Sequence, residues 1–77
     1  MKFNYSKLLG RMKEYGYTQE RLAQALGISV GTMSQKLNNK AYFYHPEMQK
    51  MCELLNITGE DVYTIFFTPE VEKNSTN

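Results

Sequence analysis

Residues 18–37 read TQERLAQALGISVGTMSQKL, and this stretch predicts two short helices joined by a tight turn. Thr18 and Ser29 are good helix N-caps, and each has one apolar residue just before it and another four residues after it. Gly27 can end the first helix, because glycine adopts positive φ at no steric cost. Ala23 is small enough to let the two helices cross closely. The sequence therefore specifies locally how both helices are directed.

The second helix of this pair, over residues 30–38, has one apolar and one outward face. Its apolar spacing turns Met33 and Leu37 inward. The residues left on the outward face are Val30, Gly31, Ser34 and Gln35. A helix fits the major groove of duplex DNA, where glutamine can pair with adenine and an apolar group can touch a thymine methyl. Gln35 is therefore the predicted base reader, with plain solvent exposure as the alternative for each side chain taken alone.

Three further helices are expected around this pair. Apolar residues spaced i, i+3, i+4, i+7 predict amphipathic helices over residues 5–15 and around 48–55, and a short fifth helix follows over residues 59–67. The start of the fourth helix stays open between Tyr44 as N-cap and Pro46 at the first helical position. The prediction is an all-α fold of five helices, with residues 1–67 as one domain and 68–77 as an extended or flexible tail.

Composition limits the functions that this chain can have. It has 77 residues and a net charge of +1, with +5 in residues 1–50 and −4 in residues 51–77. One cysteine and one histidine offer no disulfide, metal cluster or catalytic pair, so we expect no metal, no cofactor and no enzymatic activity. No apolar run is long enough for a signal peptide or a membrane span, and a cytoplasmic location without membrane association is expected.

The string TQERLAQALGISVGTMSQKLNNK, residues 18–40, resembles the helix-turn-helix pattern of phage repressor and Cro-like transcriptional regulators. The segments FNYSKLLGRMKE and YTIFFTPEVEK are similar to short Cro-like phage proteins of Gram-positive bacteria. The resemblance implies a lambda-repressor-like domain that binds double-stranded operator DNA and represses or switches transcription by occupying it. Two positions depart from the pattern: Gly31 offers no side chain to a base, and Asn39 stands where glycine is usual.

The resemblance also implies a set of DNA contacts, with motif residues 18–37 at its centre. The base contacts would be Val30, Gly31, Ser34 and Gln35. The phosphate contacts, taken together with the cationic side chains nearby, would be Gln19, Thr32, Lys36, Asn38, Asn39 and Lys40. Lys7 and Arg11 are further cationic candidates for phosphate contact, with ordinary solvated side chains as the alternative.

A lone module of this size binds DNA too weakly for useful specificity, so a homodimer that reads two half-sites is expected. The expected dimer contact is formed by Val62, Ile65, Phe66 and Phe67. Closure of the monomer core by the same residues is the rival interpretation. The alternative function is a protein-interaction module, an antirepressor or antitoxin-like partner that uses the same helical corner, and the near-neutral charge of the chain keeps it open.

Overall fold

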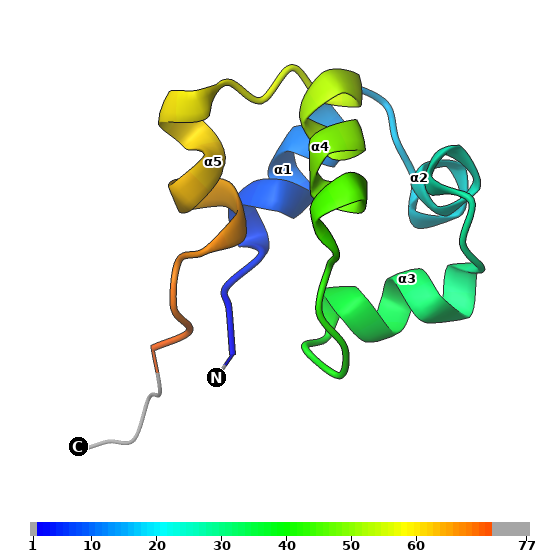
Figure 1. The fold of residues 1–77 in the computed structure, drawn as a ribbon, viewed down its shortest axis with the longest axis horizontal. Coiled ribbons are helices and arrows are strands. Elements are labelled where there is room, and N and C mark those ends of the chain that lie inside the picture. Colours follow the sequence, from blue (N-terminus) through cyan, green and yellow to red (C-terminus); the bar gives the residue numbers. More distant parts are fainter. Residues whose placement is uncertain (1, 72–77) are drawn as a thin grey trace.

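Five helices follow one another along the chain in the computed structural model, which describes residues 2–71 (Figure 1). They are α1 (Ser6–Glu14), α2 (Gln19–Leu26), α3 (Val30–Leu37), α4 (His45–Leu54) and α5 (Gly59–Phe66). The predicted all-α fold of five helices is confirmed. None of the helices in the described part of the chain is long and apolar enough to cross a membrane.

The predicted caps begin the two central helices. The Thr18 hydroxyl oxygen accepts a hydrogen bond from the Arg21 backbone N–H at 3.1 Å, at the start of α2. The Ser29 hydroxyl oxygen accepts one from the Thr32 N–H at 3.0 Å, at the start of α3. Each bond satisfies one of the free N–H groups of a first helical turn. The starts of both α2 and α3 are therefore set by local chemistry.

Four of the helices end in the same way, with one residue in the left-handed region. These residues are Gly16, Gly27, Asn39 and Asn56, with φ between 53° and 75°. In each case the next residue donates its N–H to the carbonyl five positions earlier, at 2.8 to 3.0 Å. This arrangement closes a helix and turns the chain sharply. Asn39 thus adopts the conformation that glycine would supply at this position.

The open question about the start of α4 is resolved in favour of Tyr44. This residue is the N-cap, and its backbone N–H donates to the Glu47 carboxylate at 2.9 Å. Pro46 is the second residue of the helix, where a missing N–H costs nothing. A glutamate three residues after the cap therefore compensates for a side chain that caps poorly.

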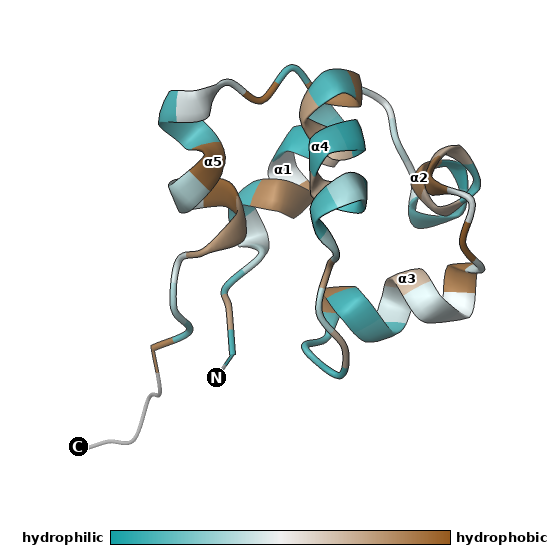
Figure 2. Cartoon of the chain, in the orientation of Figure 1, coloured by the Kyte–Doolittle hydropathy of each residue, from teal (hydrophilic) through white to brown (hydrophobic). Residues whose placement is uncertain are grey.

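The core lies where the five helices meet, and Figure 2 shows that each helix contains both hydrophobic and hydrophilic residues. Leu8, Leu22, Met33 and Met51 are completely buried within it. Contacts are densest between α2 and α3, and α1 packs along α5. Ala23 is also buried, as expected for a residue at the crossing of α2 and α3.

The predicted dimer contact is wrong for two of its four residues. Ile65 is only 4% exposed and Phe66 only 1%, and both lie in the monomer core. The ring of Phe66 packs against Phe43 with centroids 6.4 Å apart. Val62 is partly buried against the same core, and Phe67 keeps 36% of its surface exposed. The rival interpretation therefore holds for Ile65 and Phe66, because α5 needs both to close the domain.

The two ends of the described chain lie side by side (Figure 1). Phe3 and Pro69 form an isolated antiparallel bridge, flanked by hydrogen bonds from Asn4 N–H to the Thr68 carbonyl (2.8 Å) and from Glu70 N–H to the Lys2 carbonyl (2.9 Å). The segment after α5 is thus extended and paired with the N-terminal segment through Glu70. The rest of the predicted tail, residues 72–77, lies outside the described residues.

Candidate nucleic-acid interface

The outward face of α3 contains the four predicted base-contacting residues. Val30 is 45% exposed, Gly31 and Gln35 are exposed, and Ser34 is partly buried. On the opposite side of the helix, Met33 is fully buried against the core. The structure therefore brings these residues together on one accessible surface, which we call the α3 face (Val30, Gly31, Ser34 and Gln35).

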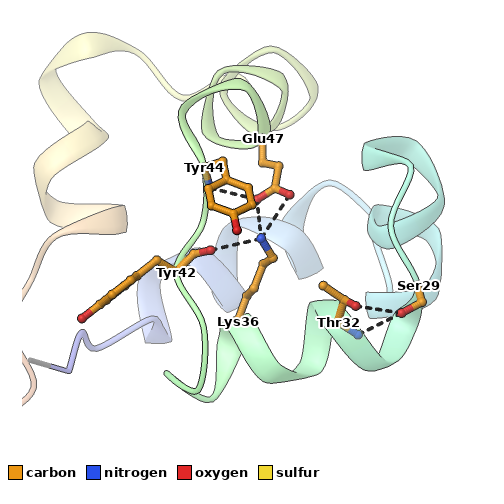
Figure 3. Close-up of polar contacts among 6 residues, drawn as sticks. All are labelled: Ser29, Thr32, Lys36, Tyr42, Tyr44 and Glu47. Carbon is orange, nitrogen blue, oxygen red and sulfur yellow. Dashed lines mark hydrogen bonds and ion pairs between the residues drawn. The ribbon is translucent and has the colours of Figure 1, made fainter.

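Lys36 does not belong to this surface, and its predicted phosphate contact is wrong. The residue is only 3% exposed. Its Nζ donates to both Glu47 carboxylate oxygens at 2.8 and 3.1 Å and to the Tyr42 carbonyl at 3.0 Å. These three hydrogen bonds occupy the three N–H donors of the ammonium within the fold. The ammonium also lies 4.1 Å from the centroid of the Tyr44 ring, a favourable cation–π contact. Figure 3 shows the side chain rising from α3 towards the start of α4.

The side chain of Lys36 therefore works as an anchor instead of a DNA contact. Glu47 receives this ammonium and the Tyr44 N–H together, so one carboxylate joins the last turn of α3 to the first turn of α4. A charged pair removed from water is stable only when its remaining donors and acceptors are satisfied, as they are here. The anchor holds the last turn of α3 against the start of α4, on the side of the helix away from the α3 face.

Asn39 is also mispredicted as a phosphate contact. Its side-chain amide accepts a hydrogen bond from the Phe3 N–H at 2.8 Å and donates to the Phe3 carbonyl at 2.9 Å. The Asn39 amide thus makes the same two hydrogen bonds to the Phe3 backbone that a neighbouring strand would make. Phe3 also forms the antiparallel bridge with Pro69. Asn39 ties the loop after α3 to the N-terminal segment, which leaves little of its amide for DNA.

The remaining predicted phosphate contacts lie around the α3 face. Gln19 is exposed at the first position of α2, and Lys40 is exposed just after α3. Asn38 is exposed, but its amide N–H is turned back to the Ser34 carbonyl at 2.8 Å. Thr32 is partly buried, and its hydroxyl accepts from Ser29 at 3.0 Å. Contact of these four residues with phosphate stays a prediction.

Arg11 is the second cation that the fold uses internally. Its guanidinium donates to the Leu55 and Asn56 carbonyls at 3.0 and 2.9 Å, and so satisfies acceptors at the end of α4. Asp61 and Glu14 lie within 3.7 Å of the same group. Of the two further candidates for phosphate contact, Arg11 is therefore engaged within the fold, whereas Lys7 on α1 is exposed.

Two side chains have pKa values displaced by their surroundings, and neither lies on the α3 face. Burial raises the pKa of the Tyr5 phenol, and the neighbouring Tyr42 adds to the effect. Burial also raises the pKa of the Cys52 thiol, with a smaller contribution from the Glu53 carboxylate. Both groups therefore stay neutral at physiological pH.

The sequence pattern did not identify Glu47 and Asn39 as residues that hold α3 and the loop after it in place. The spacing of Glu47 from Tyr44 could have indicated a cap, since glutamate at the third helical position commonly accepts the cap N–H. Its pairing with Lys36, eleven residues earlier, depends on tertiary packing and has no local signal. For Asn39, the replacement of the usual glycine was the available signal, because asparagine tolerates positive φ.

Comparison with known proteins identifies the family of this chain. A family model described as "Protein of unknown function (DUF739)" matches residues 1–69. The chain belongs to the DUF739 family. This DUF739 protein is similar to a phage regulatory protein whose solution structure is known, the modulator of repression (MOR) of the temperate bacteriophage TP901-1 from Lactococcus lactis. Sequence identity is 36%, the TM-score is 0.73, and the match covers 94% of this chain and 97% of the phage protein. A search of curated proteins finds no match.

The comparison supports the predicted fold at high coverage, since almost the whole of both chains superimposes. The similar protein is a phage modulator of repression. Membership of the Cro-like repressors stays a prediction.

Proposed function

We propose that this DUF739 protein binds double-stranded DNA through the α3 face and regulates phage-type repression by occupying an operator. The observation that carries the proposal is the presentation of Val30, Gly31 and Gln35 on one exposed helix face, with Lys36 anchored beneath it. Small and polar side chains on a rigidly held helix are what the major groove can receive. The name of the similar phage protein, modulator of repression, agrees with a regulatory role.

Salt-dependent binding of duplex DNA tests the proposal. Fluorescence anisotropy of a labelled duplex should show an affinity that falls steeply as salt rises, because neutralised phosphates release counterions. Gln35→Ala should weaken binding to the preferred sequence, whereas Gln49→Ala should not, since Gln49 is an exposed glutamine on α4. Duplex binding that is insensitive to salt, or equal loss in both variants, would contradict the proposal.

The proposal includes a symmetric homodimer on two half-sites about 34 Å apart, or a multiple of that spacing. With Ile65 and Phe66 buried, the aromatic surface left for the contact is the pair Tyr63 (64% exposed) and Phe67 (36% exposed), whose ring centroids are 6.3 Å apart. Tyr63→Glu should convert a dimer to a folded monomer in sedimentation equilibrium, with Tyr15→Glu, at the exposed residue that follows α1, as the control. A wild-type chain that stays monomeric on a palindromic duplex would remove the dimer from the proposal.

The second candidate function is interaction with another regulator through the same helical corner. α3 contains a single charged residue, Lys36, and its charge is neutralised internally by Glu47. An uncharged exposed face suits a protein partner as well as a groove, and the phage neighbour is described as a modulator. A complex with a partner regulator that forms equally well in low and high salt, without duplex DNA, would favour this function over DNA reading.

A further inference from the structure

The chemistry of the α3 face is unusually restricted. Lys36 is the only charged residue between Val30 and Leu37, and the fold has withdrawn it to 3% exposure. The exposed groups that remain are the methyl groups of Val30, the Gln35 amide and the partly covered Ser34 hydroxyl. Figure 2 shows α3 brown at its start, near white through its middle and teal only towards its end, before the hydrophobic last residue.

Among the side-chain amides of α3 and of Asn38 and Asn39 after it, only that of Gln35 is free to recognise a base edge. The amide of Asn39 is bound to the backbone of Phe3, and the amide N–H of Asn38 is bound to the Ser34 carbonyl. Gln35, in contrast, makes no side-chain hydrogen bond among the described residues, and it is exposed. Both its N–H donor and its carbonyl acceptor are therefore available together.

Base recognition in the major groove depends on complementary groups. Guanine presents two acceptors and is read mainly by arginine or lysine, whereas adenine presents one donor and one acceptor and is read by glutamine or asparagine. The thymine methyl is read by apolar contact. The exposed groups of α3 thus match adenine at Gln35 and thymine at Val30, and no exposed α3 cation matches guanine.

The spacing of these two residues sets the spacing of the bases. Val30 and Gln35 are five residues apart, which corresponds to about 7.5 Å along a helix axis. At about 3.4 Å per base step, this distance covers about two steps. Gly31 lies between them, and a Cβ placed there would meet only the Ser29 hydroxyl, at 3.9 Å. The backbone of α3 can therefore approach the groove closely at its first turn.

We infer that the operator half-site is read by α3 as A·T base pairs, with adenine opposite Gln35 and thymine opposite Val30 about two steps away. This inference rests on the proposed function and deepens it, because it names the base pairs that the α3 face selects. Guanine is discriminated against at these positions, since the anchored Lys36 cannot reach its acceptors.

Selection of bound duplexes from a random pool, run in parallel for wild type and variants, tests the inference. Wild type should enrich A·T pairs at two positions about two steps apart. Gln35→Lys should shift the preference at one of them from adenine to guanine, and Val30→Ser should lose the thymine preference at the other. Gln35→Ala should lose about 5- to 150-fold of the discrimination at its position. Gln49→Lys is the matched control, because it adds the same charge on α4.

The outcomes separate this inference from the proposed function. Enrichment of G·C pairs at the α3 positions, or duplex binding without any sequence preference, would overturn the inference and leave DNA binding in place. An unchanged selected sequence in Gln35→Lys would also overturn it. Failure to retain any duplex, even at low salt, would overturn the proposed function itself.

Discussion

Removing the charge from Lys36 should destabilise the fold strongly, although the residue belongs to a helix expected to face DNA. In Lys36→Met the unbranched side chain is only one heavy atom shorter, so most of its apolar contacts remain. It loses the three hydrogen bonds to Glu47 and Tyr42 and the contact with the Tyr44 ring. What remains is a Glu47 carboxylate with 13% exposure, satisfied only by the Tyr44 N–H.

The size of the effect follows from this geometry. Breaking a buried ion pair by removing one partner costs about 3–5 kcal/mol, because the other charge stays buried without compensation. The partial exposure of Glu47 lets water reach it, which favours the lower end, about 3 kcal/mol. For a domain of this size the melting temperature should fall by about 12–24 °C. In Lys36→Met/Glu47→Gln the amide still accepts from Tyr44 and no charge is buried, so part of the loss should be recovered.

Urea unfolding followed by circular dichroism measures these free energies of unfolding. Lys36→Met, Glu47→Gln and the double variant form a mutant cycle that gives the interaction energy between Lys36 and Glu47. Lys40→Met is the control, since Lys40 is exposed. If Lys36→Met changed the free energy of unfolding by less than about 0.5 kcal/mol, as surface substitutions do, Lys36 would not be an anchor.

Three other predictions follow from the same contacts. Asn39→Ala should lower the free energy of unfolding in urea by about 2–3 kcal/mol, because it removes two hydrogen bonds to Phe3 and places alanine at a φ of 63°. Asn39→Gly should cost about 1 kcal/mol less, because glycine adopts this φ without strain. Equal costs for the two variants would refute the contribution of backbone strain. Lys40→Ala should weaken binding to all duplexes alike and reduce the salt slope by about 0.9, whereas a changed sequence preference would make Lys40 a base reader. Cys52 should react with iodoacetamide at pH 8 more slowly in the folded than in the urea-unfolded chain, because burial and Glu53 raise its pKa and reduce the thiolate fraction; equal rates would contradict this.

The central part of the fold could be predicted from sequence because its signals are local. Thr18, Ser29 and Gly27 act within one helical turn of their own positions, and each does in the structure what its residue type favours. The outward position of Gln35 also follows from helical periodicity alone.

The errors in the predicted site have a common physical cause, contacts between residues far apart in sequence. Lys36 reads as a solvated cation until Glu47 is brought against it by the packing of α4. Asn39 reads as a loop amide until the N-terminal segment reaches it, 36 residues away in the chain. Phe66 reads as part of an apolar surface until α5 packs on the core. Local patterns specify helices and faces, and tertiary packing then decides which polar groups remain available.

Amide chemical-shift mapping by NMR, with the isotope-labelled protein and a duplex recovered by selection, tests DNA reading by the α3 face most directly. The largest shifts are expected for residues 30–38, with smaller ones at Gln19 and Lys40, and Gln35→Ala should reduce them at the same duplex concentration. Shifts confined to α1 and α5, with the amides of α3 unchanged, would contradict the proposal that α3 is the surface that meets DNA.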